Sequence, residues 1–120
     1  MSMPKNKRKI GDIGESIAVE FLRQQGYDIV EQNFVYQHGE IDVVAKDGTT
    51  LVFVEVKSRN DLRFGEPEEA VTPKKQELIR RTAEGYVQKR NIVDVECRFD
   101  VVSVILGGTK SECKILKDCF

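Results

Sequence analysis

The chain of 120 residues is long enough for one domain with one hydrophobic core. No apolar run approaches the roughly 20 residues of a membrane-spanning helix, and the charged start, MSMPKNKRKIG, has no apolar segment behind it, which argues against a secretory signal. The net charge of −1 excludes binding to nucleic acid through overall charge, so any such site must be a local cluster of Lys and Arg.

The cysteine and histidine content bears on the compartment and on the kind of metal. Cys97, Cys113 and Cys119 form no C-x-x-C pair, and the chain has one histidine. This pattern favours reduced thiols in a cytoplasmic protein. It does not favour zinc, so any metal is expected to have oxygen ligands, which points to Mg²⁺ or Mn²⁺.

The first helix is predicted from about Asp12 to Gln25, with Asp12 as its N-cap and Gly26 as the residue after its end. Residues 1–9 are predicted to be a basic tail, and residues 10–120 a single domain. The apolar residues of the helix recur with helical spacing and form one stripe: Ile10, Ile13, Gly14, Ile17, Ala18, Phe21 and Leu22.

Three strands are predicted next, at residues 27–33, 41–46 and 51–57. The last two flank Asp47-Gly48-Thr49-Thr50, and Asp-Gly between two β-rich runs is a strong hairpin signal. Residues 60–71 are predicted to be a loop.

The second helix is predicted to begin with Thr72 as N-cap and Pro73 as its first residue, and to end near Arg90. Further strands are predicted at 98–106 and 113–116, with Gly107 and Gly108 turning the chain between them. The order αβββαββ indicates an α/β domain with a mixed β-sheet flanked by helices. The buried stripe of the second helix is predicted to contain Leu78, Ile79, Thr82, Ala83, Tyr86 and Val87.

The strand at 51–57 carries Glu55 and Lys57 in an otherwise apolar run. Because side chains alternate along a strand, these two charges share one face of the sheet. A hairpin loop of four residues pairs Asp42 with Glu55, and a loop of two residues pairs Asp42 with Phe53. Either length places Asp42 on the face of Glu55, and only an odd length separates them.

Two carboxylates on one apolar face repel each other and lose solvation. A divalent cation removes both problems, so Asp42 and Glu55 are predicted metal ligands, with Lys57 as a positive charge beside the metal. The alternative is that Glu55 and Lys57 form a simple same-face pair at the end of an edge strand.

Glu15 lies at the margin of the apolar stripe of the first helix. We expect it to lean toward Asp42 and Glu55 as a third acid for the metal or its water. The alternative is a capping role, because Asp12 and Glu15 have the spacing of a capping-box variant.

Basic residues supply candidates for binding nucleic acid. Lys75 falls on the apolar stripe at the start of the second helix, where free backbone N–H groups would help it to hold a phosphate. The alternative is a lysine whose stem is buried while its ammonium reaches solvent. Gln76 is a weaker candidate, and Arg59 belongs to the basic residues at the end of the third strand.

The run GEIDVVAKDGTTLVFVEVKSR resembles the core of the PD-(D/E)xK nuclease superfamily. The chain as a whole resembles the YraN-like family of bacterial proteins, described as endonuclease-like and related in fold to archaeal Holliday-junction resolvases. The shared motifs are GDIGE at 11–15, GY at 26–27, GEID at 39–42, FVEVKSR at 53–59, FGEP at 64–67 and RFDVV at 98–102.

This resemblance implies a restriction-endonuclease-like core and metal-dependent hydrolysis of phosphodiester bonds in DNA, but it supplies no settled substrate structure. DNA is the expected partner, and branched or single-stranded forms are left open. By the same resemblance Asp42 is the superfamily aspartate, Glu55 the second acid, Lys57 the lysine and Glu15 the glutamate of the first helix. One departure is Val35, which stands where the family commonly has an arginine. The alternative function is a nuclease-like module that binds nucleic acid or a partner protein without cleavage. No membrane partner is expected, and a homodimer is left open.

Overall fold

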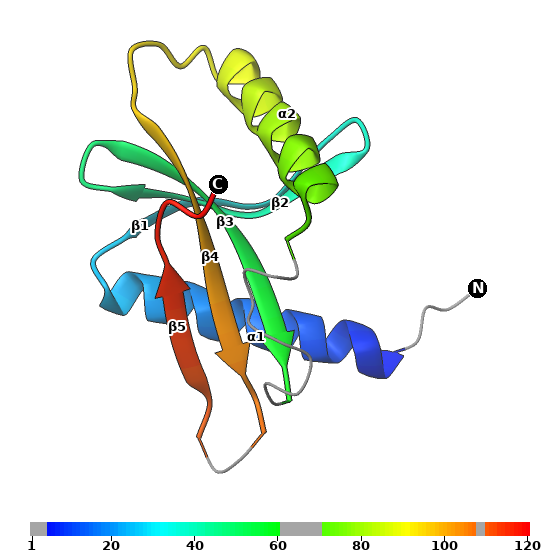
Figure 1. Cartoon of the computed structure of the whole chain (residues 1–120). Coiled ribbons are helices and arrows are strands. Elements are labelled where there is room, and N and C mark those ends of the chain that lie inside the picture. Colours follow the sequence, from blue (N-terminus) through cyan, green and yellow to red (C-terminus); the bar gives the residue numbers. More distant parts are fainter. Residues whose placement is uncertain (1–4, 61–70, 108–109) are drawn as a thin grey trace.

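Five strands form one mixed sheet with a helix before it and a helix inserted after its third strand (Figure 1). The structure, a computed structural model, describes residues 5–60, 71–107 and 110–120, with side chains from residue 13 onward. The predicted order αβββαββ and the α/β class are confirmed. The elements are α1 (Lys5–Gln24), β1 (Asp28–Tyr36), β2 (Gly39–Asp47), β3 (Thr50–Arg59), α2 (Pro73–Lys89), β4 (Cys97–Ile105) and β5 (Glu112–Leu116).

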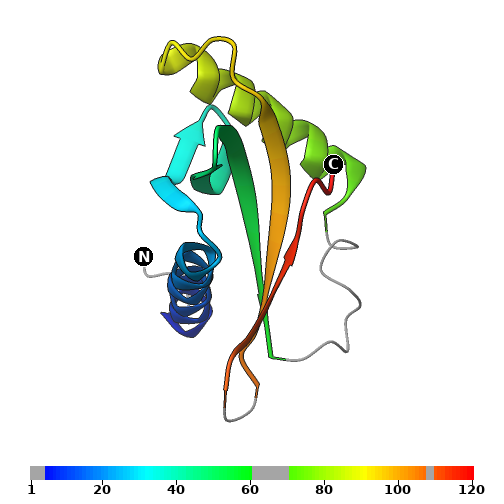
Figure 2. The ribbon, with the colours of Figure 1, turned by 90° about the vertical axis from the view of Figure 1, so that its left-hand side faces the viewer.

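The strands lie in the order β1-β2-β3-β4-β5, with β3 and β4 parallel and the other neighbours antiparallel. The two helices cover opposite faces of this sheet (Figure 2). Val52 and Val54 pack with the α1 side of the core, whereas Leu51 and Phe53 pack with the α2 side. Burial on both faces explains why the third strand is an almost unbroken apolar run.

The start of α1 differs from the prediction. The helix begins at Lys5, so Asp12 lies inside it and is not its N-cap, and residues 5–9 are helical and not a tail. Lys and Arg are good helix formers, and extending an existing helix requires little free energy per residue. The prediction that Ile13 belongs to the buried stripe is also wrong, because Ile13 is 51% exposed. The predicted end is confirmed: the N–H of Tyr27 donates to the carbonyl of Leu22, and Gly26 has a positive φ.

The second helix begins as predicted. Thr72 is its N-cap, its side chain accepts a hydrogen bond from the N–H of Lys75, and Pro73 is the first helical residue. The predicted strands are all present, with β1 extending further, to Tyr36. Residues 1–4 of the predicted tail, residues 61–70 of the predicted loop and Gly108 lie outside the described residues. In the part of the chain that is described, no helix is long and apolar enough to span a membrane.

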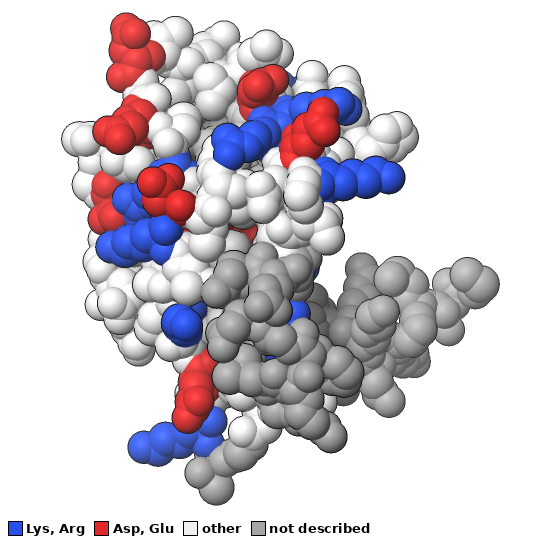
Figure 3. All heavy atoms as spheres, viewed as in Figure 1, with Lys and Arg blue, Asp and Glu red and all other residues white. Residues whose placement is uncertain are grey.

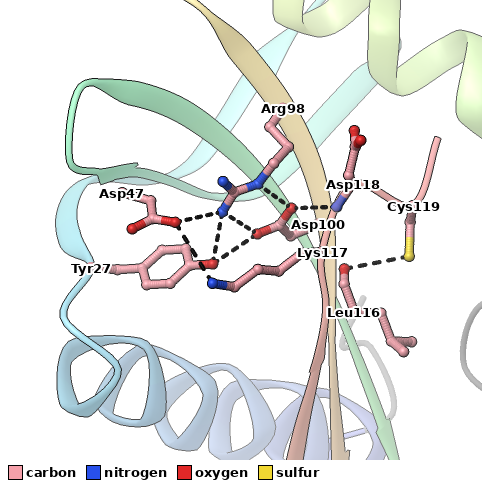
Figure 4. Close-up of polar contacts among 8 residues, drawn as sticks. All are labelled: Tyr27, Asp47, Arg98, Asp100, Leu116, Lys117, Asp118 and Cys119. Carbon is pink, nitrogen blue, oxygen red and sulfur yellow. Dashed lines mark hydrogen bonds and ion pairs between the residues drawn. The ribbon is translucent and has the colours of Figure 1, made fainter.

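A polar cluster centred on Asp100 holds β4 to three other segments on the α1 side of the sheet (Figure 4). Asp100 is fully buried and accepts four hydrogen bonds, from Arg98, the hydroxyl of Tyr27 and the N–H of Asp118. Arg98 also donates to Asp47 at 2.9 Å. A buried carboxylate with this many donors is compensated for its lost solvation. The cluster therefore gives the motif RFDVV a structural role.

Replacing Tyr27 by Phe is expected to destabilise the protein by about 1 kcal/mol, because the hydroxyl both donates to Asp100 and accepts from Arg98. The midpoint of urea unfolding measures this change. Tyr36→Phe is the matched control, since no hydrogen bond of the Tyr36 hydroxyl is found among the described residues. Equal midpoints for the two variants would contradict a stabilising role of the Tyr27 hydroxyl.

Candidate functional site

The register of the β2–β3 hairpin brings two acids to the same place. Lys46 pairs with Leu51, as predicted for a hairpin that sets Asp42 opposite Glu55. The ladder between the two strands ends at the pair of Val43 and Val54, one position before these acids. Beyond that point β2 pairs only with β1, and β3 pairs only with β4. The acids therefore lie where β2 and β3 separate.

Helix α2 accounts for this separation. It contacts β1 and β2, where Gly85 lies against the ring of Tyr36 and Gly39 lies against Thr82. Ile41 consequently packs on the α2 side of the core. Gly85 on α2 and Gly39 on β2 allow this close approach. The end of the β1–β2 hairpin therefore packs against α2 and separates from β3.

Asp42 takes over a hydrogen bond that the separated strands no longer supply. Its Oδ2 accepts from the backbone N–H of Val56 at 2.8 Å. Since buried N–H groups require a partner, this bond satisfies β3 and fixes the carboxyl of Asp42 beside the strand. The carboxyl also lies within hydrogen-bonding reach of Glu55.

The carboxyl of Asp42 has a raised pKa. Burial raises the pKa of Asp42 to about 8, and Glu55 adds to the rise through a hydrogen bond and through charge repulsion. The N–H of Val56 and the charge of Lys75 act in the opposite direction by favouring the ionised form. The pair therefore holds a proton near neutral pH when no cation neutralises it.

Glu55 is the more enclosed of the two acids. Its side chain is 8% exposed, and its Oε2 is a buried oxygen without a hydrogen bond to any described residue. The Nζ of Lys75 lies 3.7 Å from Oε2, which is an ion-pair distance and too long for a hydrogen bond. A buried carboxylate oxygen in this state is suited to a cation, and Mg²⁺ and Mn²⁺ prefer such oxygen ligands.

Lys57 lies two residues beyond Glu55 on β3 and is half-buried. The alternation of side chains places it on the same face as Glu55, and its neighbour on β4 is Ser103, a buried residue. The ammonium therefore belongs to the same strand as Glu55, whereas Asp42 belongs to β2. The predicted grouping of Asp42, Glu55 and Lys57 on one face agrees with this geometry.

Glu15 is less closely tied to this group. It is half-buried on α1, next to Gly14, which packs against Ser58 on the face of β3 that looks away from Glu55. Within the described residues, no three His, Cys, Asp or Glu side chains are close enough to hold a metal together. Glu15 therefore does not complete a three-acid cluster. The alternative capping role is also wrong, because α1 begins at Lys5.

The candidates for binding nucleic acid occupy different settings. Gln76 is half-buried, and its amide donates to the carbonyl of Val71 at 3.0 Å, so it supports the start of α2. Arg59 is half-buried at the end of β3. Val35 is 60% exposed on β1. Lysine and arginine side chains over α2 are interspersed with acidic ones, so this face has mixed charge (Figure 3).

Two contacts of the site were not predicted from the sequence. The Val56 N–H that holds Asp42 belongs to the backbone and leaves no mark in the residue types. The ion pair of Lys75 with Glu55 joins α2 to β3 across the core face. A signal for it was present, since a lysine on an apolar stripe needs a buried or bridging partner.

Comparison with known proteins places the chain among bacterial relatives of similar length. A protein of Caldicellulosiruptor saccharolyticus is 50% identical over 117 residues, which cover 96% of this chain and 99% of the relative. One from Symbiobacterium thermophilum is 43% identical over 94% of this chain and 97% of the relative, and one from Dehalococcoides mccartyi is 39% identical over 97% and 96%. Each of the three is named a UPF0102 protein. The model of that family matches residues 14–104. The chain thus belongs to the uncharacterised protein family UPF0102.

Proposed function

We propose that this protein is a metal-dependent endonuclease that hydrolyses phosphodiester bonds in DNA and belongs to the YraN-like branch of the PD-(D/E)xK superfamily. One observation carries the proposal. Asp42 and Glu55 share a buried site at which Glu55 Oε2 has no hydrogen bond to any residue that the structure describes. Such a pair is unfavourable for the fold alone, and a divalent cation relieves it. The free cysteines are compatible with a cytoplasmic location, which we include in the proposal.

Each residue of the site has a role in this proposal. Asp42 and Glu55 would hold Mg²⁺ or Mn²⁺, with the remaining ligands supplied by water, backbone or the nucleic acid. The bound ion would act as a Lewis acid on the scissile phosphate and lower the pKa of a coordinated water. Lys57 orients that water or stabilises the charge that develops on the phosphate. Lys75 and Arg59 contact neighbouring phosphates, and Glu15 is not a metal ligand in this proposal.

The direct test is a cleavage assay on linear, flapped and four-way DNA, with and without Mn²⁺. Cleavage should require the metal and should disappear in a variant carrying Asp42→Asn and Glu55→Gln. That variant retains the side-chain volumes and hydrogen-bonding groups, so it is expected to fold. Circular dichroism checks that it does, which distinguishes loss of the metal site from loss of folding. Cleavage that persists in the variant would point to a contaminating nuclease or to another site.

A second function is favoured by the surroundings of the site. Val35 is exposed where the family has an arginine, and the face over α2 has mixed charge. Both features weaken the electrostatic attraction of a DNA backbone. They are compatible with a module that does not cut, and that binds a partner protein or holds branched or single-stranded nucleic acid through few phosphate contacts. Binding to four-way DNA by a protein that cleaves no substrate with Mn²⁺ would select this function.

Mn²⁺ is expected to raise the melting temperature. At five times its dissociation constant the ion stabilises the native state by about 1 kcal/mol, which corresponds to roughly 3–5 °C for a domain of this size. Differential scanning fluorimetry in EDTA and in Mn²⁺ measures the shift. The shift should vanish when Asp42→Asn and Glu55→Gln are combined, and an equal shift in that variant would place the metal elsewhere.

Binding to duplex DNA is expected to be local and sensitive to salt. Three to five phosphate contacts predict a slope of roughly −3 to −5 in a plot of log affinity against log salt concentration. Lys75→Met should weaken binding in the presence of Ca²⁺, whereas Lys89→Met, at the other end of α2, should change it less. Equal losses in the two variants would indicate diffuse attraction and no defined groove.

A further inference from the structure

Lys75 is shared between two environments at the start of α2. Its ammonium lies 3.7 Å from the buried Oε2 of Glu55, yet its side chain is 40% exposed. The same side chain lines an open hollow of about 380 Å³ on the surface, together with Thr72, Lys74, Glu77, Leu78 and Arg81. The stem of Lys75 therefore runs between the candidate metal site and this hollow, in which three basic side chains stand with one acidic one.

The contact of Lys75 with Glu55 is suited to exchange. At 3.7 Å no hydrogen bond holds the ammonium in place, so its removal breaks an electrostatic contact only. Glu55 Oε2 has no other partner among the described residues. A divalent cation bound by Asp42 and Glu55 would supply the positive charge that Lys75 supplies in its absence. The two cations would compete for the same carboxylate oxygen and repel each other, so we expect the metal to displace the ammonium of Lys75 from Glu55.

The hollow offers an anion a small set of groups. Pro73 has no N–H, and the N–H of Lys75 donates to Thr72, so Lys74 supplies the one backbone N–H of the first turn that lacks a partner among the described residues. Arg81 is held by Glu77 at 2.7 Å. The charge available to a phosphate in this hollow thus depends on Lys74 and on whether Lys75 is engaged with Glu55.

We propose that Lys75 is an exchangeable counter-ion, which neutralises Glu55 in the metal-free protein and turns to a phosphate of the nucleic acid in the hollow once a divalent cation is bound. The proposal rests on the proposed metal site of Asp42 and Glu55. It makes metal binding and phosphate binding mutually favourable, because the metal releases the lysine that the phosphate requires. In this scheme Lys75 binds and positions the nucleic acid and takes no part in breaking the phosphodiester bond.

Affinity for Mn²⁺ without DNA is the first test, measured by isothermal titration calorimetry at pH 8. Lys75→Met removes the competing ammonium and keeps the apolar stem, so it should tighten Mn²⁺ binding by about three- to tenfold. Lys74→Met is the matched control: it lines the same hollow without a contact to Glu55 and should leave the affinity within about twofold of wild type. Unchanged or weaker binding in Lys75→Met, or equal tightening in both variants, overturns the exchange.

The second test measures DNA affinity in EDTA as a double-mutant cycle. Glu55→Gln should strengthen metal-free binding in the wild-type background, because it removes a negative charge and also releases Lys75. In the Lys75→Met background only the charge effect remains, so the gain should be at least about threefold smaller. Equal gains in the two backgrounds overturn the exchange while leaving the metal site intact. If the variant that combines Asp42→Asn and Glu55→Gln binds Mn²⁺ as tightly as the wild type does, the proposed function itself is overturned.

Discussion

Without metal, the protein is expected to lose stability as the pH rises from about 4 toward 8, and Asp42→Asn is expected to abolish that loss. The pKa of Asp42 is raised to about 8 in the folded protein by burial, and by the hydrogen bond and charge of Glu55. The folded state therefore binds a proton more tightly than the unfolded state does. Its contribution to stability is fully present below the ordinary carboxyl pKa and is lost as the pH rises through the folded value.

The expected loss is about 2–4 kcal/mol between pH 5 and pH 8.5, because each unit of pKa difference corresponds to about 1.4 kcal/mol. Asn at position 42 can still accept from the N–H of Val56 and can donate to Glu55 without titrating. Urea unfolding in EDTA across this pH range measures the slope. Asp28→Asn, at an exposed carboxylate on β1, serves as control. A wild-type slope equal to that of Asp42→Asn would show that the acid pair does not share a proton.

The effect of Mn²⁺ on this pH dependence also distinguishes a metal site from the alternative in which Glu55 and Lys57 form only a same-face pair. If Glu55 and Lys57 were only a same-face pair, the pKa of Asp42 would still be raised by burial, but Mn²⁺ would not alter the slope. If the acids form a cation site, Mn²⁺ should flatten the slope by replacing the proton. The same two residues thus connect a stability measurement to the proposed chemistry, independently of any cleavage assay.

The sequence predicted those parts of the fold that depend on local pattern. The cap of α2 was predictable because Thr72 and Pro73 act within one turn, and the end of α1 was predictable because Gly26 permits a positive φ. The start of α1 was not, since Asp12 is a good cap that the chain does not use. Helix extension toward Lys5 depends on small differences in propensity, which one favourable residue type does not reveal.

The candidate site was predictable to the extent that strand alternation governs it. The register of the hairpin placed Asp42 beside Glu55, because both acids belong to adjacent strands joined by a short turn. Contacts between distant elements were not predictable in the same way. The pairing of Lys75 with Glu55 requires α2 to lie at one position and angle over β3, which is decided by packing of residues such as Gly85 against Tyr36.

Lys57→Ala is expected to reduce hydrolysis about 10²- to 10³-fold, the loss that follows removal of one group that stabilises charge in a transition state. Lys57 is half-buried near the end of β3, so its replacement should cost no more than about 1 kcal/mol of stability. Removing a positive neighbour should also leave metal binding unimpaired or slightly tighter. Activity and stability should therefore separate in this variant.

Lys57→Arg sharpens the test, because it retains the charge but replaces a compact ammonium by a broad, planar guanidinium. Rescue should be poor if the ammonium must reach a single water or phosphate oxygen beside Asp42 and Glu55. Lys46→Ala controls for a general loss of charge and should cleave as the wild type does. Lys46 is exposed and lies beside the turn of the β2–β3 hairpin, away from the acids. The rates must be compared at saturating Mn²⁺ and DNA, so that binding differences do not enter. A folded Lys57→Ala variant that binds metal and DNA and cleaves at the wild-type rate would remove the lysine from the mechanism, and with it the reason for the charge at the end of this strand.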